Sequence, residues 1–303
     1  MTSIILVFAT LLFSNSKTLQ TQICLDRAGY SCSAIDGQWG ARSQAALCAY
    51  CEDFGLKLPN SPEEAYDKLF PSAAGIFTET ILKEEDFSSL TPIPKSPSER
   101  AELSSMGYEN MRELLAERGH LTARALERLN PNVDWDRLKP GDKILIPRFA
   151  SIEEELSAWP RTNPKAPKRP TAAKLEISLS DFRITVYDKS GKRIALFPCS
   201  IAKNKAKLPS GGELKITTVI ANPNYTYTPE DKKASRYVWP PGPRNPVGVA
   251  WIGLNLPGYG IHGTPKPETI GRPESHGCFR LTNWNAARLY AMCKVGTIII
   301  IKP

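Results

Sequence analysis

A proline-rich stretch in the middle of the chain limits how its 303 residues can fold. Pro160, Pro164, Pro167 and Pro170 stand among Lys, Arg and Thr residues. This composition favours an extended, solvated linker over packed structure. We therefore expect residues 149–172 to separate folded units. The chain is long enough for two or three domains, each with its own core.

After this linker the sequence changes to short segments that are rich in β-branched and aromatic residues and bounded by turn residues. The expected strands are 175–179, 183–187, 193–200, 214–220, 247–254 and 297–302. One helix is expected from Trp284 to about Cys293, with Asn283 as its N-cap. The sequence predicts a mostly-β domain over residues 173–303 with one late helix.

Before the linker the pattern is helical. Residues 18–90 contain two helical stretches, Leu19 to Ala28 and Ala41 to Phe54. A third helix is expected to start with Ser61 as N-cap and Pro62 at the first helical position. Together with the C-terminal strands, these features predict a multidomain α+β chain.

Residues 104–148 form a second expected unit. Two short helices are predicted at 113–117 and 123–129, and a strand at 143–147 follows a Pro140-Gly141 turn. No earlier strand is evident in the sequence of this unit.

The N-terminus carries an apolar run from Ser3 to Phe13, which has the length of a signal peptide and is too short to span a bilayer. We expect residues 1–16 to be a signal peptide, although no basic residue precedes the run. A buried N-terminal helix is the alternative. We therefore expect an exported chain, with no transmembrane span in the mature protein.

The charge balance favours anionic partners. Lys and Arg outnumber Asp and Glu by 39 to 31, giving a formal net charge of +8. Nucleic acid is not an expected partner, because no run of Lys and Arg alternates with aromatic residues.

Four of the seven cysteines lie near the N-terminus: Cys24, Cys32, Cys48 and Cys51. In an exported chain this even cluster favours two disulfides of undetermined pairing. A zinc site is the alternative, because the last two have ligand spacing. Cys199 and Cys293 are expected to be buried thiols or to pair with each other, which leaves Cys278 unpaired.

Histidine is scarce, and two of the three histidines lie close to Cys278 in the sequence. They are His262 and His276. A cysteine nucleophile needs a base to take its proton and fixed donors for the oxyanion, which backbone N–H groups beside Gly277 can supply. A structural role explains each residue singly, but their joint occurrence favours catalysis. A zinc site at these residues lacks an evident fourth ligand.

The segments Ile261-His262-Gly263-Thr264 and Ser275-His276-Gly277-Cys278-Phe279-Arg280 resemble the L,D-transpeptidase (YkuD-type) catalytic domain. Segments 208–216 and 240–248 are also similar to that family. The resemblance implies that Cys278 is the nucleophile and His262 the base. It also implies that Ser275, His276 and Gly277 shape the oxyanion hole and active-site loop, while Arg280 and Gly263 take part in substrate binding.

The family often has Asp where this chain has Asn285. In that family the cysteine attacks a tetrapeptide stem of peptidoglycan, D-alanine leaves, and an amine of a neighbouring stem resolves the thioester. The resemblance thus implies cell-wall crosslinking without a metal or organic cofactor.

Two shorter resemblances lie before the linker. Residues 28–47, with the Asp36-Gly37 turn, resemble the peptidoglycan-binding-like helical domain. Residues 104–148 resemble a LysM module, a βααβ unit that binds N-acetylglucosamine glycans, through Leu129-Asn130-Pro131 and Pro140-Gly141-Asp142. The implied partners are stem peptides and glycan strands, and the implied location is the periplasm or cell wall. L,D-carboxypeptidase activity, anchoring of a protein to the wall, and non-catalytic wall binding remain as alternatives.

Overall fold

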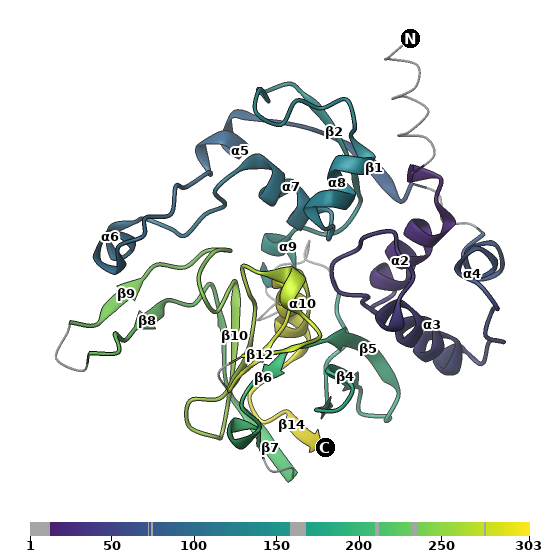
Figure 1. The fold of residues 1–303 in the computed structure, drawn as a ribbon. Helices are drawn as coiled ribbons and strands as arrows, with labels where there is room; N and C mark the ends of the chain where they lie inside the picture. Colours follow the sequence, from purple (N-terminus) through teal and green to yellow (C-terminus); the bar gives the residue numbers. More distant parts are fainter. Residues whose placement is uncertain are drawn as a thin grey trace.

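The computed structural model describes residues 13–71, 73, 75–157, 168–209, 212–231, 235–275 and 277–303 (Figure 1). In Figure 1, helices α7 and α8 and strands β1 and β2 lie at the top, and α2, α3 and α4 lie at the right. The strands of the C-terminal part lie below them, and α10 runs near the centre.

Three helices make up the first unit: α2 (Lys17–Arg27), α3 (Ala41–Phe54) and α4 (Pro62–Leu69). The range of α3 and the start of α4 are as the sequence predicts, whereas α2 begins before the expected Leu19. The Ser61 hydroxyl accepts a hydrogen bond from the Glu64 N–H at 3.1 Å, which makes it the N-cap of α4. Gly55 ends α3 with a φ of 62°, a conformation that suits glycine because it has no Cβ.

The second unit contains a strand that the sequence did not reveal. β1 (Phe77–Ile81) pairs antiparallel with β2 (Lys143–Pro147), although it lies within the range expected for the first unit. Between them lie α5 (Glu84–Ser88), α6 (Pro97–Glu102), α7 (Met111–Arg118) and α8 (Ala123–Leu129). The sequence did not indicate β1, because none of its residues is fully buried and the strand with which it pairs is distant in sequence.

One hydrophobic core runs through both N-terminal units. Leu19 and Ile23 of α2 belong to the same buried cluster as Leu114 of α7, Leu126 of α8 and Ile144 of β2. Fully buried aliphatic side chains of this kind supply most of the favourable free energy of folding. The two units therefore share an interior.

Part of the expected linker is folded, which corrects the prediction for residues 149–172. α9 (Ile152–Ser157) packs against α10 (Asn283–Met292) and buries Glu155. The Glu155 carboxylate accepts a hydrogen bond from Arg169 at 2.9 Å. The composition of this segment did not indicate α9, because the residues that the helix packs against lie elsewhere in the chain. Residues 158–167 lie outside the described part.

The C-terminal domain is mostly β, as predicted, and is built on an eight-stranded sheet with the order β13-β11-β10-β7-β14-β3-β4-β5. Its strands are β3 (Lys174–Ser178), β4 (Arg183–Tyr187), β5 (Arg193–Pro198), β7 (Gly212–Ala221), β10 (Ala250–Leu254), β11 (Gly260–His262), β13 (Phe279–Arg280) and β14 (Ile298–Lys302). β11 with β13 and β14 with β3 pair in parallel, and the other neighbours are antiparallel.

Four shorter strands form two further pairs, β12 with β6 and β8 with β9. They are β6 (Ile201–Ala202), β8 (Tyr225–Tyr227), β9 (Tyr237–Trp239) and β12 (Pro273–Ser275). Two short 3₁₀ helices are η1 (Lys205–Lys207) and η2 (Pro267–Thr269). β12 leads directly into the segment that contains Cys278.

Helix α10 is buried along its whole length. Its N-cap is Thr282, whose hydroxyl accepts from the Asn285 N–H at 3.4 Å, so the prediction of Asn283 was wrong. Thr and Asn are both good N-caps, and the local sequence does not separate them. The Asn285 side chain is fully buried and donates to the Ser31 hydroxyl at 2.8 Å, which joins α10 to the first unit.

All seven cysteines are described, and all are free thiols. The expected N-terminal disulfides are therefore absent from this structure. Cys24 lies in the core shared by the two N-terminal units, whereas Cys32 and Cys51 lie in a separate cluster beside α3. Within the described ranges, no group of three or more His, Cys, Asp and Glu residues is arranged to hold a metal ion.

Most of the expected signal peptide, residues 1–12, lies outside the described part. Phe13 is buried under the guanidinium of Arg128, and Ser16 caps α2. Among the helices that the structure describes, none has the length and apolar character needed to cross a membrane.

Candidate active site

His262 is the last residue of β11 and is 5% exposed. Its Nδ1 atom forms a hydrogen bond with the Gly263 carbonyl at 2.7 Å. Because a carbonyl can only accept, Nδ1 carries the proton, and Nε2 is left with the lone pair that a base requires. The indole of Trp251, on the neighbouring strand β10, stacks on the imidazole at 5.6 Å between ring centroids.

Cys278 immediately precedes β13, which pairs in parallel with β11. Ile261 lies opposite Phe279 and His262 opposite Arg280, so the same register places Cys278 opposite Gly260. This pairing places the segment that contains Cys278 beside the end of β11, which carries His262.

The Cys278 side chain is half-buried, and its Sγ lies 3.4 Å from the Gly258 carbonyl. The thiol thus donates to a backbone carbonyl. Catalytic hydrogen bonds often tighten only when substrate binds, so this contact is compatible with later proton transfer to His262.

Ser275 holds the turn that presents the thiol. Its hydroxyl donates to the Cys278 carbonyl at 2.5 Å and accepts from the Gly277 N–H at 3.2 Å. The Ser275 carbonyl in turn accepts from the Lys203 N–H at 2.9 Å. His276 lies outside the described residues, so its expected role stays a prediction.

Arg280 lies on β13 beside both reacting groups. Its positive charge lowers the pKa values of His262 and Cys278, although burial has the larger effect on each. Nη1 donates to the Glu274 carbonyl at 3.4 Å, and the buried Nε has no hydrogen-bond partner among the described residues. A guanidinium with an unused donor suits a carboxylate ligand.

The electrostatics favour a neutral resting pair. Burial lowers the pKa of His262 to about 4, against the opposing hydrogen bond to Gly263. Burial also raises the pKa of Cys278, opposed by a backbone hydrogen bond from Gly260 and by the charge of Arg280. At neutral pH the site therefore holds a thiol and an uncharged imidazole, and the imidazole must act as a general base when the thiol attacks.

Gly263, predicted from its place beside His262, is tightly packed. A Cβ at this position would lie 2.3 Å from Oδ1 of Asn283 and 3.2 Å from Cα of Gly248. Sequence reasoning did not assign Asn283 or Trp251 to this site. Both come from distant elements, and no local motif marks them.

The other two C-terminal cysteines lack this environment. Cys199 and Cys293 are fully buried, and burial raises the pKa of each thiol well above its usual range. Buried thiols of this kind are chemically inert.

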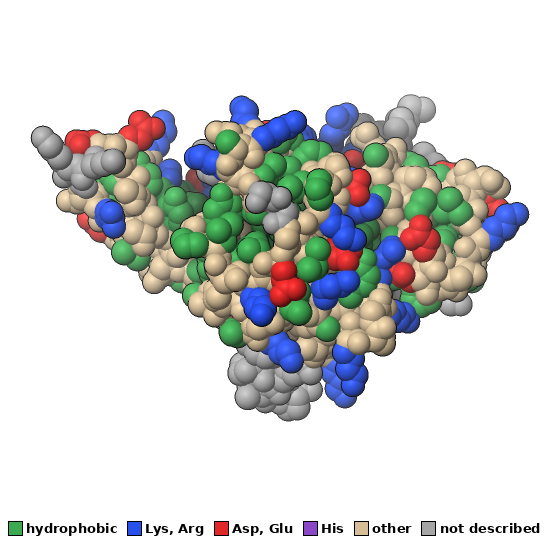
Figure 2. All heavy atoms as spheres, turned by 90° about the horizontal axis from the view of Figure 1, so that it is seen from below, with side chains coloured by type: hydrophobic (Ala, Val, Ile, Leu, Met, Phe, Trp, Pro, Cys, Tyr) green, Lys and Arg blue, Asp and Glu red, His purple; other side chains and the backbone are tan. Residues whose placement is uncertain are grey.

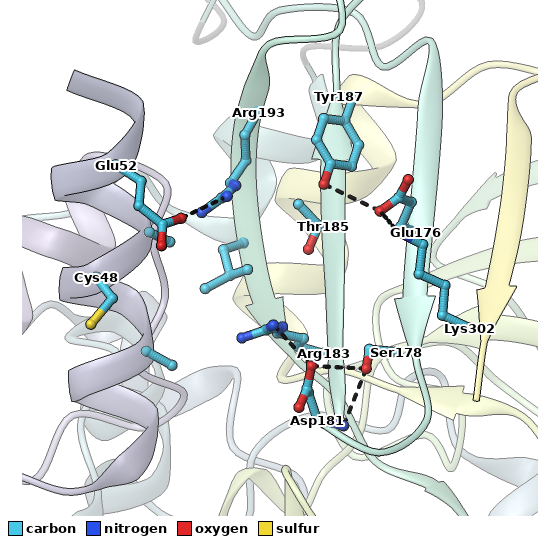
Figure 3. Close-up of a pocket in the computed structure, with 13 residues that line it drawn as sticks. Cys48, Glu52, Glu176, Ser178, Asp181, Arg183, Thr185, Tyr187, Arg193 and Lys302 are labelled. Atoms are coloured by element: carbon cyan, nitrogen blue, oxygen red, sulfur yellow. Dashed lines mark hydrogen bonds and ion pairs between the residues drawn. The ribbon is translucent and has the colours of Figure 1, made fainter. Parts of the chain in front are cut away.

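A polar pocket of about 400 Å³ lies at the opposite end of the sheet, between α3 and strands β3, β4 and β5 (Figure 3). Its charged side chains pair with one another, as in Arg193 with Glu52 at 3.1 Å and Lys302 with Glu176 at 2.7 Å. It contains neither Cys278 nor His262. Figure 2 shows Lys and Arg interspersed with Asp and Glu on the face seen from below, without a large patch of one sign.

Comparisons with known proteins agree with this geometry. A family model described as the L,D-transpeptidase catalytic domain (YkuD) matches residues 172–301. The chain is 26% identical over 182 residues to a putative L,D-transpeptidase YkuD of Bacillus licheniformis, covering 60% of this chain and 87% of that protein. It is 38% identical over 115 residues to a putative L,D-transpeptidase of Fuscovulum blasticum, covering 37% of this chain and 59% of that protein.

Among solved structures, an L,D-transpeptidase from Mycobacterium smegmatis aligns at 21% identity with a TM-score of 0.36, covering 44% of this chain and 59% of that one. The assignment depends on the sequence comparisons, and the matching family model spans the segment that contains His262 and Cys278. Residues 172–301 are therefore an L,D-transpeptidase catalytic domain of the YkuD family.

Proposed function

We propose that the chain is a peptidoglycan L,D-transpeptidase in which Cys278 is the nucleophile and His262 the base. The observation that supports this proposal is the parallel pairing of β11, which ends at His262, with β13, which begins directly after Cys278; the buried imidazole of His262 has an unprotonated Nε2. The resting pair is neutral, as the directions of the two pKa shifts require.

The reaction proceeds in two acyl transfers. The Cys278 sulfur attacks the carbonyl of a donor tetrapeptide stem while Nε2 of His262 takes the thiol proton. Collapse of the tetrahedral intermediate breaks the amide bond, and the leaving D-alanine amine takes the proton from His262. An acceptor amine then attacks the thioester, loses a proton through His262 and restores the thiol.

The remaining site residues assist this chemistry in the proposal. The Ser275 hydroxyl fixes the turn at Gly277 and Cys278 by accepting from the Gly277 N–H and donating to the Cys278 carbonyl. The Cys278 backbone N–H is proposed to stabilise the developing oxyanion, with His276 and Gly277 shaping the loop around it. The cationic guanidinium of Arg280 is proposed to bind a stem-peptide carboxylate. Gly263 keeps the backbone close to His262.

The N-terminal units are proposed to hold the enzyme on its polymer substrate. Residues 18–90 act as a peptidoglycan-binding-like domain and residues 104–148 as a LysM-like module. β1 (Phe77–Ile81) lies within the first of these ranges, but it pairs with β2 and so supplies the outer strand that residues 104–148 lack. Binding to an insoluble polymer raises the local concentration of donor stems. Residues 1–16 are proposed as the export signal.

The test is intact-protein mass spectrometry after incubation with a carbapenem. The wild-type protein is expected to gain one adduct, and Cys278→Ala is expected to gain none. A folded, reduced wild-type protein that forms no adduct would overturn the catalytic proposal and favour a non-catalytic wall-binding protein. Release of D-alanine from a tetrapeptide without formation of a crosslinked product would favour the carboxypeptidase alternative.

A further inference from the structure

The Asn283 side chain lies between the second unit and the strand that holds His262. Its Nδ2 atom donates to both carboxylate oxygens of Glu117, at 3.1 and 3.2 Å, and to the Pro243 carbonyl at 3.0 Å. Glu117 belongs to α7 and is 7% exposed, whereas Asn283 is fully buried at the start of α10.

The other end of the same amide faces two glycines. Oδ1 of Asn283 has no hydrogen-bond partner among the described residues. A Cβ built on Gly248 would lie 2.1 Å from this oxygen, and one built on Gly263 would lie 2.3 Å from it. Only hydrogen atoms fit in that space, so the position of the amide sets how far the Gly263 backbone can move.

Gly263 is also the residue that fixes the base. Its carbonyl accepts the Nδ1 hydrogen bond of His262 at 2.7 Å, which selects the tautomer with a free Nε2. The contacts therefore form a chain from Glu117 through Asn283 and Gly263 to His262. Three of these residues belong to the catalytic domain, and Glu117 belongs to the second unit.

Burial of Glu117 is energetically unfavourable. Its hydrogen-bond donors, Tyr108 at 2.9 Å and Asn283, are neutral. Burial, together with the nearby charges of Glu113 and Glu153, raises its pKa to about 8, against the hydrogen bonds from Tyr108 and Asn283. A buried carboxyl group without a cationic partner costs folding free energy. Departures from low-energy packing of this kind concentrate at functional sites.

We propose that Glu117 and Asn283 are positioning residues for the base. The second unit, through Glu117, holds the Asn283 amide against Gly263, and the Gly263 carbonyl holds His262 in its working orientation and tautomer. This inference rests on the proposed function, and it makes the docked second unit part of the working active site as well as a wall-binding module.

The decisive variant is Asn283→Ala, measured by the pH dependence of Cys278 acylation with a carbapenem. Removing the amide frees Gly263, so His262 loses its fixed orientation. Acylation at neutral pH is expected to slow about 10–100-fold, because misplacing a reacting group by 1 Å costs about that much. The acidic limb of the profile of acylation rate against pH is expected to move to higher pH as the orientation of His262 becomes less constrained. Arg280 is the charged group that faces His262 in both the wild type and the variant.

The matched control is Asn285→Ala, on the same helix. Asn285 is equally buried, and its amide donates to Ser31 without touching Gly263. Both variants are expected to lower the melting temperature, but Asn285→Ala should keep the wild-type acylation rate and pH profile. Equal rate losses in the two variants would indicate a purely structural role and overturn the inference.

Two milder variants test Glu117 if Asn283→Ala does not fold. Glu117→Ala should slow acylation in the same way, whereas Glu117→Gln keeps an acceptor oxygen for Asn283 and should recover most of the rate. Nitrogen-15 NMR of His262 gives a readout that needs no substrate. A single tautomer protonated at Nδ1 is expected in the wild type and a mixture in Glu117→Ala.

The two proposals fail separately. Absence of a carbapenem adduct on the wild-type protein contradicts the proposed function, whatever the variants do. A wild-type protein that acylates normally, with variants at positions 117 and 283 within about twofold of its rate and unchanged His262 spectra, contradicts the positioning role alone.

Discussion

His262 and His120 are both buried histidines, and burial lowers the pKa of each to about 4. His120 belongs to the second unit and contacts Trp284 of α10. Its ring stacks on that of Phe149 at 3.8 Å and on that of Trp284 at 4.9 Å between ring centroids. Its Nδ1 contacts the Asp26 carboxylate at 3.1 Å. His262 instead stacks on the indole of Trp251 and bonds to a carbonyl.

The comparison of His120 with His262 shows that burial of a histidine does not by itself indicate a catalytic role. The Asp26–His120 pair has the residue types of a catalytic dyad, and Asp26 also binds Arg288 of α10. Two aromatic rings stack on the His120 imidazole. His262 has a fixed tautomer, and Cys278 immediately precedes the strand that pairs with β11. A shifted pKa therefore identifies a functional histidine only together with the geometry around it.

The largest expected difference concerns the thiols. Cys278→Ala should abolish adduct formation with a carbapenem, because it removes the proposed nucleophile. Cys199→Ala should leave the adduct mass and rate unchanged, since that thiol is fully buried and its pKa is raised. Mass spectrometry of both variants measures this, and an adduct on Cys278→Ala would assign the nucleophile to another residue.

Replacing the two histidines should likewise have different effects on the acylation rate. His262→Gln is expected to slow acylation about 10²–10⁴-fold, the usual contribution of a general base. His120→Gln should keep the acylation rate within a few-fold and instead lower the melting temperature, because it removes the contact with Asp26. Stopped-flow acylation and thermal unfolding of each variant distinguish the two roles. Similar rates in both variants would contradict the comparison.

Asp26 is expected to matter for stability. It is fully buried between His120 and Arg288, and although burial opposes them, these partners hold its pKa well below the usual range. Asp26→Ala leaves Arg288 with less compensation and should lower the free energy of unfolding by about 3–5 kcal/mol. The exposed pair of Asp67 with Lys17 is the control, and Asp67→Ala should cost about 0–1 kcal/mol. Urea unfolding measures both.

The smallest effect is a slope of stability with pH. Both histidines have folded-state pKa values below the unfolded value, so between pH 6.5 and about 4 the unfolded chain binds protons that the folded chain does not. Their contribution is present above pH 6.5 and is lost as the pH falls, at about 1.4 kcal/mol per pH unit for each histidine. His120→Gln should reduce the slope of stability with pH by the contribution of one histidine. An unchanged slope would contradict the assignment.

The sequence determined the features that depend on local chemistry. The bounds of α3, α8, β2 and β4 and the start of α4 follow from apolar spacing, caps and turn residues, and the structure agrees with them. The segments around His262 and Cys278 were sufficient to predict the catalytic domain, because a nucleophile, a base and flexible glycines must recur together for acyl transfer.

Only the tertiary structure decided what joins distant parts of the chain. The pairing of β1 with β2, the helix α9 and the contact between Glu117 and Asn283 all link segments far apart in sequence. Side chains such as Trp251 and Asn283 gain their roles from neighbours that no local pattern encodes. The physical reason is that packing and burial depend on which surfaces meet, and short-range spacing carries no information about that.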